Sequence, residues 1–392
     1  MFAYGVLGVV LVLYLAARGL SEAGVGLLLT LTLLGDAAIS LGLSTRADRW
    51  GRRRTLAAGA VLMLLGGWVM AATGDFVLLA LAATIGVISP TGSEVGPFLA
   101  VEQACLAQVT VARDRTRVFA WYNVAGFLAT ALGAVTSGVV SEALQRAGWT
   151  ALESYRVLFV AYGALGGIIG LMSLRLDEAV EVQQTLESKE EGAARPMLGL
   201  GQSRGIVMRL SGLFALDAFG GGFIVQSFLV YWFHRKFGVG EATLGSLFFG
   251  TNLLSGLSAL AAVPLARRIG LVNTMVWTHL PSNLLLMLVP LMPTFGWAVA
   301  ALLVRHAISQ MDVPTRQSYV NAVVPASERS AANGVTGTAR QFGASLAPVL
   351  AGPLLGSAAL AAAPFLVSGG LKIVYDLLLW RSFRRMKPPE EA

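Results

Sequence analysis

Long apolar runs separated by short polar breaks constrain this chain more than any other feature. We place runs long enough to form membrane helices at residues 2–18, 24–44, 55–73, 76–108, 118–140, 154–174, 206–233, 242–263, 271–291, 295–323, 331–357 and 360–380. One membrane crossing needs about 20 mainly apolar residues. Only 13% of the 392 residues are charged, about half the share found in soluble domains. The pattern therefore predicts an all-α membrane protein with twelve transmembrane helices and excludes a soluble fold.

A single hydrophilic segment separates the runs into two sets of six. This segment contains EAVEVQQTLESKEEGAARP and has the charge density of a solvated linker. At about 30 residues it is too short to form a folded catalytic domain. We therefore predict an N-terminal six-helix bundle over 1–174, a cytoplasmic linker over 175–204, a C-terminal six-helix bundle over 205–380 and a cytoplasmic tail over 381–392.

Basic residues in the polar breaks fall mainly on one side of the predicted bundle. The opposite side holds Arg18, Arg146, Arg156, Arg235 and Lys236. Lys and Arg are retained on the cytoplasmic side of a membrane, so we predict a multi-pass protein of the cell membrane with both termini cytoplasmic. The net charge of +7 comes from short clusters rather than one basic face, and so does not indicate nucleic-acid binding.

The two halves repeat short patterns at the same topological places. The pentapeptide ADRWG at 47–51 corresponds to ARRIG at 266–270, 219 residues later. The tripeptide DRT at 114–116 corresponds to ERS at 328–330, 214 residues later. Two six-helix halves related by an axis along the membrane normal are a known transporter plan. We therefore expect two pseudo-symmetric bundles.

The loop LSTRADRWGRRR at 43–54 resembles the signature between helices 2 and 3 of the major facilitator superfamily, an Asp-Arg-x-Gly-Arg-Arg turn. The matching positions are Asp48, Arg49, Gly51, Arg52 and Arg53. The resemblance covers the whole chain and implies the fold of that superfamily. It also implies that the loop is a cytoplasmic gate, with Asp48 facing the start of helix 11 near Ser330. The alternative is a basic anchoring loop without a gating role.

Charged side chains inside apolar runs are candidates for function, because each costs about 2.5–3.5 kcal/mol at mid-bilayer. The fourth run holds Glu94 and Glu102, eight residues apart, so both can point inward. Its two prolines and two glycines predict a bend or break. A carboxylate in such a place can take up a proton.

The tenth run has the densest charge. Arg305, Asp312 and Arg316 lie on one helical stripe, so Asp312 can pair with either arginine. At the repeat offset of 214, Arg316 corresponds to Glu102. In the superfamily helices 1, 4, 7 and 10 line the central cavity, and the resemblance implies that these charges face it.

Other charges are scattered over the remaining runs. Asp217 in the seventh run is expected to line the cavity, while Arg340 and Lys372 either snorkel to an interface or pair structurally. His234 and His279 are expected at membrane interfaces. The predicted substrate or proton site thus comprises Glu94, Glu102, Asp217, Arg305, Asp312 and Arg316, with Asp36, His306 and Arg340 as further candidates.

These features predict a secondary transporter of a small solute that works by alternating access and is coupled to protons, as a monomer in the lipid bilayer. No nucleotide-binding P-loop is present, which excludes an internal ATPase. No metal-ligand spacing or nucleophile elbow indicates an enzyme, a metal or a cofactor. Efflux is favoured by family prevalence, although the fifth run lacks the antiporter signature GxxxGPxxGG. The alternatives are a uniporter or an uptake symporter for an organic anion or metabolite and, more remotely, a membrane sensor or enzyme.

Overall fold

The computed structural model describes residues 1–92, 98–111, 115–181, 200–325 and 328–386, with only the backbone for a few of these, Asp48 and Ser330 among them. Throughout the described part, helices follow one another with short connections and no strand occurs. The predicted all-α class is confirmed. The predicted site residue Glu94 lies outside the described residues.

The first six runs form helices close to the predicted positions. They are α1 (Phe2–Ala17), α2 (Glu22–Ser44), α3 (Ala47–Trp50), α4 (Arg52–Ala72), α5 (Phe76–Ile85), α6 (Phe98–Val109), α7 (Arg115–Arg146) and α8 (Ala151–Leu174), followed by the 3-10 turn η2 (Glu178–Val180). The fourth run is interrupted between α5 and α6, where its prolines and glycines predicted a bend or break.

The second six runs are more often interrupted. They form α9 (Arg204–Gly222), α10 (Gln226–Phe237), α11 (Glu241–Ile269), α12 (Leu271–Leu288), the 3-10 turn η4 (Val289–Leu291), α13 (Phe295–Ser309), α14 (Asp312–Val323), α15 (Arg329–Leu346), α16 (Pro348–Gly356) and α17 (Ala363–Phe383). The seventh run is divided into α9 and α10, the tenth into α13 and α14, and the eleventh into α15 and α16. Pro348 begins α16, where its missing N–H group costs least.

Many of the helices have the length and composition of membrane spans. Eight described helical segments are long and apolar enough to cross a bilayer, and α1 and α5 are shorter apolar helices. Their outward faces carry exposed apolar side chains, including Leu65, Trp68, Leu171, Leu257 and Leu284. In lipid such faces are solvated, whereas in water they would associate. The molecule is therefore a multi-pass membrane protein.

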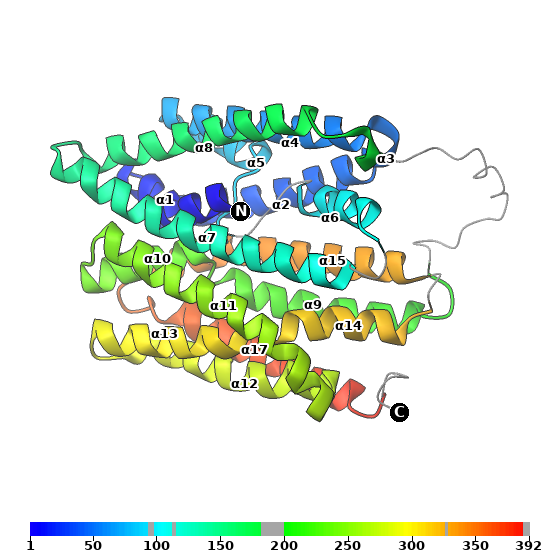
Figure 1. The fold of residues 1–392 in the computed structure, drawn as a ribbon. Helices are drawn as coiled ribbons and strands as arrows, with labels where there is room; N and C mark the ends of the chain where they lie inside the picture. The colour runs from blue at the N-terminus through cyan, green and yellow to red at the C-terminus, as the bar shows by residue number, and fades with distance from the viewer. Residues whose placement is uncertain (93–97, 112–114, 182–199, 326–327, 387–392) are drawn as a thin grey trace. The chain divides into compact units, whose positions relative to one another are not determined.

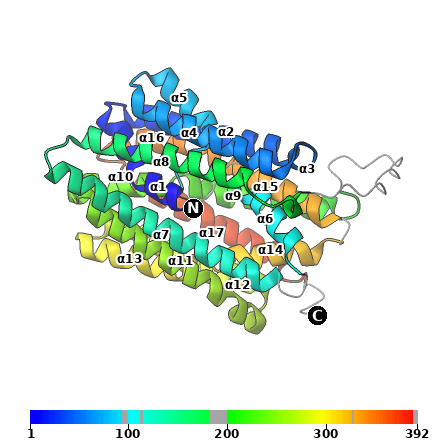
Figure 2. The ribbon, with the colours of Figure 1, turned by 45° about the horizontal axis from the view of Figure 1, so that its top comes forward.

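The chain forms two compact units. Unit 1 comprises Met1–Leu186 and Val225–Phe249, and unit 2 comprises Glu187–Ile224 and Gly250–Ala392. Within unit 1, α4 lies beside α8 and α1 lies beside α7, as both ribbon views show (Figures 1 and 2). The predicted domain boundaries around 175–204 stay a prediction.

Helices in unit 1 approach one another closely at small residues. A Cβ atom built on Gly67 of α4 would lie 2.8 Å from the amide nitrogen of Gly163 and from the carbonyl oxygen of Phe159 in α8. Such close backbone contacts are typical of helix association in membranes, where packing replaces the hydrophobic effect. The abundant glycines therefore decide which helices pair.

Unit 2 uses the same device to bring α9 against α15. A Cβ on Gly222 would lie 2.3 Å from the carbonyl oxygen of Ala344, and one on Gly343 would lie 2.4 Å from that of Ala215. In the same unit α17 packs against α9 and α12, and α14 packs against α12 and α15. The helices that carry the predicted residues Asp217, Asp312, Arg316 and Arg340 thus belong to one set of packed helices.

Candidate functional site

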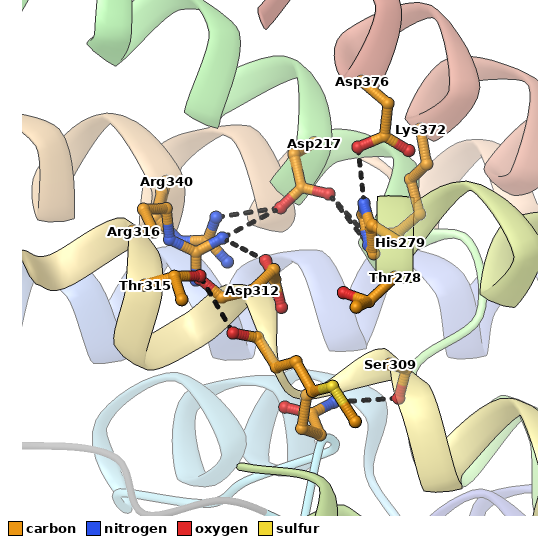
Figure 3. A network of polar contacts seen from close by, with 12 residues as sticks. Asp217, Thr278, His279, Ser309, Asp312, Thr315, Arg316, Arg340, Lys372 and Asp376 are labelled. Carbon is orange, nitrogen blue, oxygen red and sulfur yellow. Dashed lines mark hydrogen bonds and ion pairs between the residues drawn. The ribbon is translucent and has the colours of Figure 1, made fainter. Parts of the chain in front are cut away.

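The carboxylate of Asp217 on α9 lies buried in unit 2, with 2% of the residue exposed, and gathers basic side chains from neighbouring helices (Figure 3). Lys372 of α17 donates to Oδ1 at 2.7 Å. Arg340 of α15 donates to Oδ2 at 2.9 Å. Arg316 of α14 lies 3.5 Å from the same oxygen. The carboxylate of Asp217 therefore links α9 electrostatically to α14, α15 and α17.

Arg316 also binds a second carboxylate. Its Nη1 donates to Oδ2 of Asp312 at 2.8 Å, one helical turn earlier on α14. The guanidinium carbon lies 5.5 Å from the centre of the Phe214 ring, within range of a cation–π contact. Of the two pairings that the sequence spacing allowed for Asp312, the structure forms the one with Arg316.

His279 of α12 connects Asp217 to another buried acid. Its Nδ1 lies 2.8 Å from Oδ1 of Asp376 on α17, and its Nε2 lies 3.9 Å from Oδ1 of Asp217. Asn283 donates to the other oxygen of Asp376 at 3.0 Å. His279 is buried within the unit, with 4% of the residue exposed, and its expected place at a membrane interface stays a prediction. Asp376 was not among the predicted residues, although an acid one turn after Lys372 in an apolar run is a signal of pairing.

The network balances its charges when His279 is neutral. Three carboxylates, those of Asp217, Asp312 and Asp376, face three basic groups: Arg316, Arg340 and Lys372. Arg340 and Lys372 thus pair with an acid rather than snorkel. Removing one member of a buried ion pair leaves its partner uncompensated, which is strongly unfavourable. The arrangement can therefore hold unit 2 together, and it can also respond to a charged ligand.

Arg305 of α13 is a further basic side chain, which forms no ion pair with the three carboxylates of this network. It is 8% exposed, its Nη1 lies 3.1 Å from Nε2 of His306, and its Nε has no hydrogen-bond partner. No carboxylate among the described residues lies within 4 Å of it. Nδ1 of His306 lies 3.0 Å from the hydroxyl of Ser255 on α11. The result is a buried cation beside neutral polar groups.

Unit 1 holds the remaining predicted acids. Tyr122 of α7 donates its hydroxyl to Glu102 of α6 at 2.7 Å. The described residues place no basic side chain within 4 Å of this half-buried carboxylate. Asp36 is 7% exposed and lies buried in α2.

The predicted gate loop is bound to the segment after α8. Gly51 links α3 to α4 with φ of +104°, a conformation that favours glycine. Glu181 accepts hydrogen bonds from the backbone N–H groups of Arg52 at 2.7 Å and Arg53 at 3.1 Å. The Arg52 guanidinium also donates to Gln108 at 2.7 Å. Glu181 therefore caps α4, a role that sequence reasoning missed because it placed this acid in a linker.

The other residues of the gate loop are less constrained. Arg49 is exposed at the end of α3. Arg53 donates through its guanidinium to the carbonyl oxygen of Leu174. The side chain of Asp48 lies outside what the structure describes, so its predicted approach to Ser330 stays a prediction. In the described part of the chain, no cluster of three or more His, Cys, Asp or Glu side chains could hold a metal ion.

Comparisons with known proteins place this architecture in a family. The family model described as "Major Facilitator Superfamily" matches residues 1–304 and 210–392. A protein of Saccharomyces cerevisiae named "Uncharacterized membrane protein YJR124C" is 30% identical over 405 residues, which cover 97% of this chain and 90% of the relative.

Solved transporters share the fold. The crystal structure of a D-xylose-proton symporter has a TM-score of 0.75 at 15% identity, covering 97% of this chain and 94% of the other. A variant of the nucleoside transporter NupG has a TM-score of 0.74 at 13% identity, covering 97% of each chain. The predicted twelve-helix plan is consistent with both, and the family model covers the whole chain. The chain belongs to the major facilitator superfamily.

Proposed function

We propose that this protein is a proton-coupled secondary transporter that moves a small anionic solute by alternating access. The proposal depends on one observation: the buried guanidinium of Arg305 has no described carboxylate within 4 Å, although Asp312 and Asp217 act on it at longer range. The other basic side chains buried in the spans of unit 2 have acidic partners. Arg305 is therefore the group best suited to bind the anion of a substrate.

The surroundings of Arg305 favour a carboxylate or phosphate. A guanidinium presents donors in a fixed fork that matches two anionic oxygens, and its unpartnered Nε leaves one edge of the fork available. Ser255 and His306 add polar groups beside it. Arg316 is a poorer candidate for this role because it is already bonded to Asp312. An anion at Arg305 would supply the missing counter-charge.

Counting the charges that protonation would leave uncompensated also distinguishes the candidate proton carriers. Protonating Asp217 would leave Lys372 and Arg340 without a negative partner in a buried site. Protonating Glu102 leaves no described basic side chain unpaired, because its hydrogen-bond partner is the neutral hydroxyl of Tyr122 and the amino group of Met1 acts on it only from beyond 4 Å. Glu102 is therefore the proposed proton carrier among the described residues. Glu94 stays a candidate on sequence grounds.

The D-xylose-proton symporter among the structural relatives supports proton coupling as the driving force. Alternating access is reversible, so the same site serves efflux, which family prevalence favours, or uptake. We propose that the protein acts as a monomer in the cell membrane with both termini cytoplasmic, since basic residues gather in the loops on that side.

Transport in proteoliposomes containing a trapped pH dye tests the proposal. The panel comprises dicarboxylates, sugar phosphates and other organic anions, with xylose and nucleosides as neutral solutes. We expect anions to evoke proton movement in the wild type. Arg305→Gln should raise the KM for the anion at least 30-fold, which corresponds to about 2 kcal/mol, the cost of truncating one partner of a buried charge pair. Arg305→Lys should recover part of the loss.

Two further variants separate substrate binding from coupling. Glu102→Gln should still exchange the anion but move no protons. Arg381→Gln, an exposed arginine of the same unit, should behave as the wild type. Equal transport of the anion by wild type and Arg305→Gln would refute the anion site. Anion transport without proton movement in the wild type would instead indicate a uniporter.

A further inference from the structure

The segment after α8 has a defined fold of its own. The carboxylate of Asp177 accepts a hydrogen bond from the N–H group of Ala179 at 2.8 Å, which forms the 3-10 turn η2. The next residue, Val180, is buried, with 8% exposed. A flexible linker needs neither a capped turn nor a buried apolar side chain. The turn η2 is therefore part of the packed structure of unit 1.

Gln108, close to the end of α6, links this turn to α4. Its Oε1 accepts a hydrogen bond from Nη1 of Arg52 at 2.7 Å. Its Nε2 donates to the carbonyl oxygen of Ala179 at 3.1 Å and to the carbonyl oxygen of Glu181. One side-chain amide therefore bonds α6 both to α4 and to the segment around η2.

Arg52 and Glu181 complete this arrangement. Nη1 of the buried Arg52 lies 3.3 Å from the carbonyl oxygen of Ala104 on α6 and 3.1 Å from that of Val180 in η2. The carboxylate of Glu181 accepts the backbone N–H group of Arg52 at 2.7 Å. We call Arg52, Gln108 and Glu181 the clip, because together they join α4, α6 and η2.

The helix that the clip holds is short. α6 has 12 residues, and a helix of about that length is only marginally stable without packing. It packs against α2, α4 and η2, and its residues Val101 and Cys105 are buried one turn apart. The thiol of Cys105 lies within electrostatic range of both Arg52 and Glu102. The clip and Glu102 therefore belong to the same part of α6.

We propose that the clip positions Glu102 for proton transfer by holding α6 against α4 and η2. In this position the Glu102 carboxylate accepts a hydrogen bond from the hydroxyl of Tyr122 on α7 at 2.7 Å. A displacement of about 1 Å would stretch this contact beyond the range of hydrogen bonds, and a misplacement of about that size can cost about 100-fold in rate. Arg52, Gln108 and Glu181 touch neither the anion nor the proton, and they act through α6.

The thiol of Cys105 provides a direct measure of how firmly α6 is held. Cys105 is the only cysteine of the chain and lies between two residues that Arg52 contacts, Ala104 and Gln108. Its rate of alkylation by a maleimide in the purified full-length protein follows the opening of α6. Arg52→Gln and Gln108→Leu should each raise this rate about 10-fold, which corresponds to about 1.4 kcal/mol, within the usual range for one lost hydrogen bond. Cys105→Ser gives the background.

Two further variants separate the clip from the charge of this loop. Arg54→Gln removes an exposed arginine two residues further along α4, and its Cys105 should be alkylated at the wild-type rate. Arg52→Lys keeps the charge but cannot present several donors in a fixed fork, so it should recover only part of the loss. Melting temperatures verify that each variant is folded.

Proton and anion fluxes in proteoliposomes connect the clip to Glu102. This arm rests on the proposed role of Glu102 as the proton carrier. The clip belongs to unit 1 and Arg305 to unit 2, so the clip variants should move fewer protons per anion while the KM for the anion is unchanged. Glu102→Gln gives the ratio of a carrier that moves no protons. A general loss of folded protein would instead lower both fluxes and leave their ratio as in the wild type.

The outcomes distinguish the clip from the proposed carrier. Alkylation of Cys105 at the wild-type rate in both Arg52→Gln and Gln108→Leu would overturn the inference. So would faster alkylation with the wild-type ratio of protons to anions, if Glu102→Gln abolishes proton movement. Proton movement that persists in Glu102→Gln would refute the proposed carrier rather than the clip, and the alkylation rates would then decide whether the clip holds α6.

Discussion

The two units satisfy their buried acids in different ways. In unit 2, Asp217 is bonded to the amine of Lys372 and the guanidinium of Arg340. In unit 1, Glu102 accepts a hydroxyl from Tyr122, and Glu241 accepts a hydroxyl from Tyr155 at 2.5 Å. A carboxylate that is hydrogen-bonded to neutral donors can be protonated without leaving a buried basic side chain uncompensated. A carboxylate that is paired with basic side chains cannot. In the proposed mechanism, this difference assigns proton uptake to unit 1 and anion binding to unit 2.

The largest expected effect is the difference in stability between a variant that neutralises Asp217 in unit 2 and one that neutralises Glu102 in unit 1. Asp217→Asn should lower the free energy of unfolding by about 3–5 kcal/mol, because it leaves buried cations uncompensated. Glu102→Gln should lower it by less than about 1 kcal/mol, since an amide can still accept the Tyr122 hydroxyl. Denaturant unfolding of both variants in detergent micelles measures the difference. Similar losses for the two variants would contradict the comparison.

Helix packing should be equally sensitive to an added Cβ atom in both units. The two units should therefore differ only in how they pair their buried charges. Gly343→Ala in unit 2 and Gly67→Ala in unit 1 should each cost about 1–3 kcal/mol, because the new Cβ meets backbone atoms. A Cβ atom on Gly334 or Gly337 of α15 would have no neighbouring atom within 4 Å, so Ala at either position should be neutral or stabilising by up to about 1 kcal/mol. Thermal melts of the four variants compare these effects.

The next effect concerns the start of α4 in unit 1, which Glu181 caps. Glu181→Gln should weaken the cap on α4 and cost about 1 kcal/mol, the usual value for a lost helix cap. Glu178→Gln makes the same charge change three residues earlier on an exposed side chain, and we expect no measurable loss. If the two variants unfold at the same denaturant concentration, Glu181 does not stabilise the start of α4.

The smallest effect is expected at Glu328, between α14 and α15. The Ser203 hydroxyl, with the backbone N–H groups of Gln202 and Ser203, stabilises its ionised form and lowers its pKa below the ordinary value of 4.5. The resulting stability is present above that value and is lost as the pH falls through the lowered pKa. The melting temperatures of wild type and Glu328→Gln should therefore differ at pH 7 and converge in acid. A constant difference would contradict this account.

Most of the fold could be predicted from the sequence, because apolar runs must cross a membrane as helices. The break in the fourth run followed from Pro90 and the residues after it. The break between α13 and α14 also has a sequence cause: Pro314 cannot donate to the carbonyl of Gln310, and the helix restarts at Asp312. The break between α9 and α10 follows three consecutive glycines, which permit an interruption but do not require one.

The site was predictable only where partners lie close in sequence. Asp312 and Arg316 are one turn apart on a helix, so their pairing followed from spacing. Asp217 lies 123 residues from Arg340 and 155 residues from Lys372. Which bases reach Asp217 depends on how α9 packs against α15 and α17, and that packing is decided by glycine contacts that no spacing rule describes.

The separation between Asp217 and Lys372 also matters while the chain is being made. Asp217 belongs to the first helix of unit 2, whereas Lys372 and Asp376 belong to the last one. At about 5–20 residues per second, synthesis of the intervening 155 residues takes roughly 8–30 s. During that interval the carboxylate of Asp217 cannot yet pair with the amine of Lys372. A nascent chain that stops before α17 therefore carries an uncompensated charge, by which membrane quality control can distinguish it from a finished one.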